Sequence, residues 1–479
     1  MTAVVSASQA VASGDAPVAV IGGGLAGLTA ALDLVEAGLP TVLFERRPFP
    51  GGKAYSFRDP NFEITLDNGQ HITMRCCTAF QGLLDRLELG RLVSYQDELY
   101  VPVIDPFARG RRLSAIAARQ PPLLRYLTNS AAPVTAPLHL AWSILTYAHL
   151  SAEEKARLGL AMDRIRRLSE AERRTLDRQT FAEWLSANGQ TARMIQRIWD
   201  LIVLPTCNDR SADVSAAQAI QVFQVGFLTK PRAGDIGLFR GGLSVVSDHA
   251  LAAFRQLGGD ARLTTPVHQI GTDGSRAVHV SYGSNGQQQQ ISAAVLALPP
   301  QHALPLLPRG WRQREPFWRF ERHQTSPIVN VHMQWDRTVM LGDFAAVLDP
   351  HVQFVFNRSR LHGISGPSHW VSVSISGAHE IIDDPQQAIV DRAEAGLRRA
   401  LKRARSAKLL AARVVKEREA TFRPLPGMAA HRPKPRTPIR NLALAGAWTD
   451  TGWPATMESA VRSGHAAAET ILEQLGASS

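Results

Sequence analysis

The sequence predicts an α/β protein of two to three domains that contains a Rossmann-like, dinucleotide-binding domain. Three observations support this prediction. Residues 17–47 follow the order strand, glycine turn, helix, strand; residues from about 86 to 229 show mostly helical patterns; and residues from 441 onward predict a strand, a loop and a closing helix. A chain of 479 residues is also long for a single hydrophobic core.

The composition is that of an ordinary soluble globular protein, with 45% hydrophobic residues, 20% charged residues and a mean hydropathy of -0.10. We expect disorder only in the first dozen or so residues, which are small and uncharged and make a poor secretory signal. Cys76, Cys77 and Cys207 are too few and too poorly spaced for a disulfide framework or a zinc site. These features predict a reduced, cytoplasmic protein without a bound metal.

The net charge of +11 requires a partner or a solvated basic face. We expect no nucleic-acid partner, because the basic residues form no recognisable nucleic-acid-binding module with aromatic residues. They concentrate at 109–125 and 156–178, next to apolar helical stretches, which suits peripheral contact with an anionic membrane. The apolar stretch 132–150 is interrupted by prolines and histidines, so we expect it to enter one leaflet at most.

A dinucleotide-binding motif follows the first predicted strand. Gly22 allows a tight turn, Gly24 lets the backbone approach a pyrophosphate, and Gly27 lets the helix pack on the strand. The N-terminus of that helix would face the phosphates. Glu45, at the end of the second strand, is placed to accept hydrogen bonds from ribose hydroxyls.

The continuation favours FAD over NAD. Glu45-Arg46-Arg47, followed by Gly51-Gly52-Lys53, resembles the FAD fingerprint of amine-oxidase-like and phytoene-desaturase-like flavoproteins. G-G-L at 241–243 with T-P-V at 265–267, and A-G-x-W-T at 445–449 before the last helix, resemble two further segments of that superfamily. The resemblance implies an FAD site made by Gly22, Gly24, Gly27, Glu45, Arg46, Gly52, Lys53, Val267, Gly446, Trp448, Ala455 and Thr456.

Within that resemblance, the backbone of Val267 would hold the adenine, and the helix beginning near Ala455 would stabilise negative charge on the reduced flavin. One departure is Gly446-Ala447, where the superfamily usually has Gly-Asp. Either Asp450 supplies the carboxylate instead, or FAD is held more weakly.

Two stretches resemble a narrower family, the squalene-associated FAD-dependent desaturases that dehydroxylate hydroxysqualene in hopanoid biosynthesis. These are LDNGQH at 66–71 and WTDTGWPATMESAVRSG at 448–464. The resemblance implies an isoprenoid substrate and reductive removal of the allylic hydroxyl of hydroxysqualene to give squalene. The electron donor that reduces the flavin is unknown.

The predicted domains are discontinuous. Residues 15–85, 230–300 and 420–479 would form the FAD-binding domain. Residues 86–229 and 301–419 would form an interleaved substrate domain with a mixed sheet and a helical, membrane-facing cap. We expect SNGQQQQ at 284–290 to form the polar turn of a hairpin.

Loss of an allylic hydroxyl requires an acid that protonates the leaving oxygen. The candidates are His71 and Asp67, because the corresponding superfamily segment runs beside the flavin; Asp67 could instead orient His71. A histidine needs little pKa tuning for this role, whereas an aspartate would need a pKa raised by burial. The structural alternative is an Asx turn at Asp67 with His71 as a core residue. We expect a structural role for Glu458.

Two other functions remain open. An oxidative carotene desaturase, of the phytoene or zeta-carotene type, would use the same cofactor and an apolar tunnel but would need no acid. A membrane-associated isoprenoid carrier would bind little or no flavin.

Overall fold

The computed structural model describes residues 16–60, 62, 64–109, 113–118, 136 and 138–476. One part of the fold is a five-stranded parallel sheet. The runs VAVI and TVLF are buried along their whole length, as expected for strands covered on both faces. In spatial order the strands are β10 (Asp260–Arg262), β2 (Thr41–Phe44), β1 (Val18–Ile21), β14 (Ala293–Leu296) and β20 (Leu442–Leu444).

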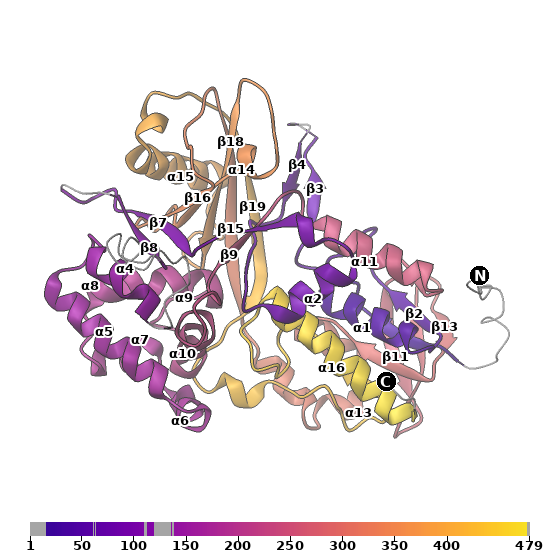
Figure 1. Ribbon diagram of the computed structural model, residues 1–479. Coiled ribbons are helices and arrows are strands. Elements are labelled where there is room, and N and C mark those ends of the chain that lie inside the picture. Colours follow the sequence, from indigo (N-terminus) through magenta and orange to yellow (C-terminus); the bar gives the residue numbers. More distant parts are fainter. Residues whose placement is uncertain are drawn as a thin grey trace, which may run out of the picture.

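Helices cover one face of this sheet (Figure 1). The last helix lies directly on the first, because Gly464 has no side chain at the crossing: a Cβ there would lie 2.5 Å from the carbonyl oxygen of Ala26. The covering helices are α1 (Leu25–Glu36), α2 (Thr78–Arg86), α11 (Ser244–Gln256) and α16 (Met457–Leu475).

A three-stranded antiparallel sheet and short helices cover the other face. The strands are β11 (Val267–Thr272), β12 (Ala277–Tyr282) and β13 (Gln287–Gln290). The prediction that SNGQQQQ is only a turn was wrong: its four glutamines form β13, which pairs with β12, and the turn precedes them. An exposed edge strand tolerates glutamines, because their backbone groups pair whatever the side chain. The nearby helices are α12 (Pro300–Ala303), η6 (Leu304–Leu306), α13 (Arg309–Arg312), η7 (Phe317–Arg322) and η9 (Met428–His431).

A seven-stranded mixed sheet forms the second large part of the fold, with α15 (Gln386–Ala400) packed on it (Figure 1). The residues 93–117, expected to be helical, instead contain strands. YVPVI is rich in β-branched residues and finds a parallel partner far along the chain, in β16. The order is β19 (Leu409–Phe422), β15 (Thr325–Trp335), β18 (His369–Ser376), β17 (Phe354–Asn357), β16 (Phe344–Val347), β7 (Tyr100–Ile104) and β8 (Leu113–Ala117).

The helical region begins only after β8 and packs around its own apolar core (Figure 1, magenta). The predicted capping box is confirmed: the Ser151 hydroxyl accepts from the backbone of Glu154, whose carboxylate accepts from the backbone of Ser151. The helices are η2 (Leu138–Leu140), α4 (Ala141–Thr146), α5 (Ala152–Arg167), α6 (Glu170–Thr175), η3 (Leu176–Arg178), α7 (Phe181–Ala187), α8 (Ala192–Met194), η4 (Ile195–Trp199), α9 (Asp200–Cys207), α10 (Ala216–Phe223) and η5 (Gln224–Leu228).

Two small antiparallel sheets join these parts. One consists of β3 (Ser56–Arg58) and β4 (Thr65–Asp67). In the other, β9 (Ile236–Phe239) lies between β5 (Ile72–Met74) and β6 (Val93–Tyr95). The remaining short helices are η1 (Gly90–Leu92), α14 (Arg358–Leu361) and η8 (Lys402–Arg405).

Some predictions concern residues that the structure does not describe. The expected disorder of the first dozen residues and most of the basic stretch 109–125 lie outside the described residues. So do the first residues of the apolar stretch 132–150. Within the part of the chain that is described, no helix is both long and apolar enough to cross a bilayer. The division into two discontinuous domains stays a prediction.

Candidate functional site

The glycine turn after β1 has the geometry that its sequence predicts. Gly22 has a φ of +110°, and a Cβ there would lie 2.5 Å from the carbonyl oxygen of Ala297. A Cβ at Gly27 would lie 1.9 Å from the carbonyl oxygen of Gly22, so only glycine lets α1 pack on the turn. At Gly24 the nearest atom to such a Cβ is the Cα of Gly52, at 3.8 Å. The two glycines therefore leave room beside Gly24 for a ligand.

The N-terminus of α1 faces this space. Its N-cap residue is Gly24, and no described side chain caps it. The first N–H groups of a helix have no partner within the helix and carry a partial positive charge, so they suit a phosphate.

Glu45 braces the glycine turn. It is 7% exposed, and its carboxylate accepts hydrogen bonds from the backbone N–H of Gly23, at 2.7 Å, and of Arg47, at 2.8 Å. Each oxygen keeps lone-pair capacity for a ribose hydroxyl. The sequence therefore placed this acid correctly, at the end of β2 and beside the turn.

The loop after β2 closes over Gly24. Gly51 forms an isolated β-bridge with Gly24, and Gly52 adopts a φ of +61° above it. The Lys53 ammonium donates to the backbone carbonyl of Glu419 in β19 of the mixed sheet. Arg46 is exposed. Gly51 and Gly52 thus lie against the glycine turn, next to the N-terminus of α1.

The segment before β11 lies beside Glu45. The backbone N–H of Thr265 donates to the carbonyl oxygen of Glu45, and that of Thr264 donates to the carbonyl oxygen of Arg47. Val267, two residues further on, is the first residue of β11. The structure therefore brings Val267 close to the acid that was predicted to bind the ribose.

The C-terminal motif forms a tight turn after β20. Gly446 has a φ of +141°, and its backbone N–H donates to the Ser463 hydroxyl on α16. The Trp448 indole is buried and donates to the carbonyl oxygen of Leu298. Arg432, also buried, donates to the carbonyl oxygens of Ala447, Trp448 and Thr449. Burial lowers the pKa of Arg432 to about 10.

Asp450, considered as a substitute for the carboxylate missing at Ala447, is exposed, and its backbone N–H donates to Pro433. Helix α16 begins at Met457, two residues later than expected, with Thr456 as its N-cap and Ala455 just before it. Glu458 has a structural role: its carboxylate accepts from the backbone N–H groups of Ala79 and Phe80 at the start of α2.

The polar segment 67–71 lies where the nucleotide loops meet the mixed sheet. The Asp67 side chain is 2% exposed. Its carboxylate accepts from the Ser56 hydroxyl at 2.6 Å and from the Leu243 N–H at 3.1 Å, and it pairs with Arg358 at 3.3 Å. The His362 imidazole lies 3.7 Å away.

Burial opposes ionisation of Asp67, but Arg358, His362 and the hydrogen bonds outweigh it, so the pKa of Asp67 is lowered. An ionised aspartate is no proton donor. Buried cationic and N–H partners stabilise the charged form of Asp67, so this geometry favours His71 over Asp67 for the predicted acid.

Asn68 ties this segment to the nucleotide loop. Its amide nitrogen donates to the Lys53 carbonyl oxygen at 3.0 Å and to the Glu417 carboxylate at 3.1 Å. Its amide oxygen accepts from the Tyr55 N–H at 3.2 Å. The position of His71 is thereby linked, through residues 53–55, to the loop over Gly24.

His71 is half-buried just before β5. Its Nδ1 lies 2.9 Å from the carbonyl oxygen of Gly69, while the described hydrogen bonds and ion pairs of Asp67 go elsewhere. Asp67 therefore does not orient His71 by direct contact. Burial lowers the pKa of His71, and the hydrogen bond to Gly69 opposes that shift. Ile72 and Met74 of β5 pack on the apolar core of the helical region.

Sequence reasoning missed the residues of the mixed sheet that complete this site. Arg358 and His362 come from α14 and the residue after it, and His332 on β15 lies 3.0 Å from the carbonyl oxygen of Asp67. Asn330 donates to the carbonyl oxygen of Asn68. These four residues stand in unremarkable stretches, so the sequence holds no motif that could have identified them.

These residues fit a dinucleotide cofactor on three grounds. The N-terminus of α1 is uncapped, the glycines leave room beside Gly24, and the buried Glu45 is within reach of the turn. In addition, the side-chain oxygens of Gln70 and Asn330 are buried without a hydrogen-bond partner among the described residues. A bound group with N–H donors would satisfy them, and the isoalloxazine ring carries such a donor.

A small apolar cavity lies inside the helical region, about 30 Å³ in volume. The Ser143 and Tyr147 side chains are the polar exceptions in its lining. It is lined by Ile116, Leu140, Ser143, Ile144, Tyr147, Leu158, Met162, Ile198, Ile202, Phe223 and Phe227.

The fold is shared with solved amine oxidases. A triple mutant of putrescine oxidase superposes with a TM-score of 0.71 at 18% identity, covering 96% of this chain and 99% of that one. Among curated proteins, a hydroxysqualene dehydroxylase of Rhodopseudomonas palustris is 28% identical, covering 95% of this chain and 97% of the relative. A probable zeta-carotene desaturase of Synechococcus elongatus is 26% identical, covering 95% of this chain and 98% of the relative.

The model of a whole protein family matches as well. It spans residues 25–472, from the first residue of α1 almost to the end of α16. The match therefore covers the mixed sheet, the helical region and the parallel sheet apart from β1, but it leaves out Gly22 and Gly24 of the glycine turn. The chain belongs to the family of flavin-containing amine oxidoreductases, and its cofactor is FAD.

Proposed function

We propose that this FAD-dependent oxidoreductase acts on a long isoprenoid, and specifically that it reduces hydroxysqualene to squalene. The similarity to hydroxysqualene dehydroxylase supports the substrate class, since it runs over 97% of that relative. The similarity to a carotene desaturase supports the same class.

The observation that carries the proposal is the position of His71. Its segment is bonded on one side to the loop over Gly24. On the other side, β5 packs on the apolar core of the helices. A proton donor between a nucleotide site and apolar walls suits a hydrophobic substrate that loses a hydroxyl.

In the proposed reaction His71 donates a proton to the hydroxyl oxygen, the carbon–oxygen bond breaks, and water leaves. Reduced FAD, when bound, supplies the hydride that forms the new carbon–hydrogen bond. The apolar lining keeps bulk water from the allylic carbon while it carries positive charge. Ionised Asp67 holds the segment in place through Arg358 and does not exchange a proton.

We also propose how the chain holds FAD. The N-terminus of α1 with Gly22, Gly24 and Gly27 would bind the pyrophosphate. Glu45 would bind the ribose, and the backbone of Val267 would contact the adenine. The remaining contacts, around the loop after β2 and the C-terminal turn, would come from Arg46, Gly52, Lys53, Gly446, Trp448, Ala455 and Thr456.

A single-turnover experiment tests the reaction. Holoenzyme is reduced without oxygen and mixed with hydroxysqualene, and the products are separated by mass spectrometry. We expect squalene in an amount equal to the reduced flavin, with reoxidation of the flavin at the same rate. Flavin that stays reduced, with hydroxysqualene recovered intact, would contradict the proposal.

A second candidate is oxidative desaturation of a carotene, favoured by the match to the zeta-carotene desaturase. The same protein with oxidised FAD is then incubated with phytoene or zeta-carotene. Bleaching of the flavin, together with a longer conjugated chain in the product, would favour this candidate. A carrier without flavin is disfavoured, because the family is flavin-containing.

A further inference from the structure

Large apolar side chains are exposed mainly in one region of the molecule. Among the described residues, ten such side chains are exposed, and six of them fall between residues 107 and 160. Three of these six belong to the short stretch formed by η2 and α4: Leu138 is 63% exposed, Trp142 38% and Leu145 65%. Exposed apolar residues grouped in this way mark an interaction surface.

The same stretch has a second apolar face that points inward. Leu140, Ser143, Ile144 and Tyr147 line the apolar cavity described above. The Ser143 hydroxyl anchors α4 to β8, through hydrogen bonds with the backbone of Ala115 and Ala117. Helix α4 therefore forms one wall of the cavity, and its outer side chains form the exposed apolar surface.

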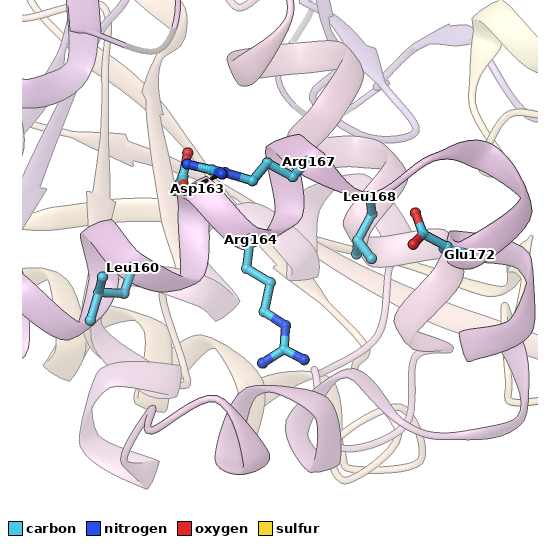
Figure 2. A pocket seen from close by; sticks show the side chains of 6 residues that line it. All are labelled: Leu160, Asp163, Arg164, Arg167, Leu168 and Glu172. Carbon is cyan, nitrogen blue, oxygen red and sulfur yellow. Dashed lines mark hydrogen bonds and ion pairs between the residues drawn. The ribbon is translucent and has the colours of Figure 1, made fainter.

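One basic group lies at the end of the exposed face, and another lies further along α5. The Lys155 ammonium donates to the carbonyl oxygen of Leu145, at the end of α4. Further along α5, Arg164 points into an open groove of about 450 Å³ with Leu160, 74% exposed, at its rim (Figure 2). No ion pair joins Arg164 to another described residue, whereas Arg166 and Arg167 both pair with Asp163.

We propose that the outer face of η2, α4 and α5 docks on an anionic phospholipid bilayer, and that α4 is the gate through which an isoprenoid leaves the bilayer for the cavity. The role of α4 as a gate for an isoprenoid rests on the proposed function. With α4 seated, the cavity of about 30 Å³ holds no isoprenoid chain, so α4 must move outward to admit one. Leucine and tryptophan partition into the interface, and lysine and arginine attract anionic headgroups.

A second copy of the chain is the less suitable occupant. A self-complementary contact on this face would bring Lys155 and Arg164 close to the same residues of the other copy. Like charges in an interface oppose association, whereas anionic lipid compensates them. The net charge of +11 favours the lipid in the same way.

The test compares the wild-type holoenzyme with the double variant Leu138→Ser/Leu145→Ser. The matched control is Leu257→Ser, at the end of α11, where the leucine is 47% exposed. Binding to phosphatidylcholine vesicles, with and without phosphatidylglycerol, is measured by flotation. We expect wild type and control to bind the phosphatidylglycerol vesicles, more weakly as salt rises, and the double variant to bind at least about tenfold less.

Turnover is then measured with hydroxysqualene in vesicles and in detergent. The gate predicts that the double variant is slow only with the vesicle-borne substrate, with unchanged flavin content. Equal vesicle binding by the wild type and the double variant would overturn the proposal. It would also be overturned if the wild type formed a dimer and the double substitution dissociated that dimer. Loss of binding in the double variant, with no squalene from any protein, would overturn the proposed function and leave the docking surface standing.

Discussion

The carboxylate of Asp67 and the guanidinium of Arg358 form a buried ion pair, 3.3 Å apart, in which the side chains are 2% and 0% exposed. The pair joins the strand before the polar segment to α14 of the mixed sheet. The Ser56 hydroxyl and the Leu243 N–H complete the shell of the carboxylate. The segment that carries His71 is therefore fixed by contacts from three distant parts of the chain.

Breaking this pair should destabilise the protein strongly. Arg358→Ala leaves the Asp67 carboxylate buried without its cation, which costs about 3–5 kcal/mol. Urea denaturation followed by circular dichroism measures the effect. The control lies two residues away: Arg360 pairs with Asp343 at 2.6 Å but is 60% exposed, so Arg360→Ala should cost less than about 1 kcal/mol. Similar losses for the two variants would contradict this prediction.

Acid should destabilise the site through His362. Burial and the neighbouring Arg358 lower the pKa of His362 to about 4, against 6.5 for an unperturbed histidine. The unfolded chain therefore binds a proton at a higher pH than the folded one. Stability from the neutral imidazole is fully present above pH 6.5 and is lost as pH falls from 6.5 through about 4.

His362→Gln should flatten the dependence of the urea midpoint on pH in that window. His268→Gln is the control, because His268 is exposed, and should leave the slope as in wild type. A His362→Gln protein with the wild-type slope would show that His362 is not responsible.

His71 should set both the rate and the pH dependence of the proposed reaction. His71→Gln removes a general acid, so squalene formation in a single turnover should slow by at least about 10²-fold with unchanged flavin content. Since the pKa of His71 is lowered, the protonated fraction grows as pH falls below 6.5, and the wild-type rate should rise in that direction. The variant should lose this rise. The control is His465→Gln, which changes an exposed histidine paired with Asp33 and should keep the rise in rate at low pH.

The glycine turn allows cofactor binding to be separated from folding. A Cβ at Gly24 meets no atom closer than 3.8 Å, so the Gly24→Ala apoprotein should keep the wild-type urea midpoint. Its methyl group would occupy the space for the pyrophosphate, so the flavin-to-protein ratio should fall by at least about tenfold. Gly27→Ala should instead lower both the urea midpoint and the flavin content, because its Cβ would lie 1.9 Å from the Gly22 carbonyl oxygen. Full flavin content in Gly24→Ala would contradict the assignment.

Sequence alone predicts the parts of this protein that local geometry dictates. The glycine turn, Glu45 and the capping box at Ser151 each depend on residues a few positions apart, or on a strand and helix in succession. The glutamine strand was missed because four glutamines show no hydrophobic alternation, although its partner β12 is close in sequence. Strands β6 to β8 were missed because β6 and β7 pair with strands far along the chain, and β8 pairs with β7. Strand β7, for instance, pairs with β16.

The same limit applies to Asp67. The sequence shows a polar segment next to a nucleotide motif, and this suffices to locate a site. The charge state of its acid depends on Arg358, which lies 291 positions later and belongs to no motif. Only the folded chain shows the buried ion pair and hydrogen bonds that stabilise the charged form of this aspartate.

The parallel sheet has a consequence for how the protein is made. Its edge strand β20 and the helix that covers α1 are the last elements of the chain, at 442–444 and 457–475. Until the ribosome has released these residues, α1 lacks its neighbour and Gly446, Trp448 and Thr456 are not in place. The glycine turn is synthesised first, yet the sheet that carries it and the helix that covers α1 are complete only once residues 442–475 have followed.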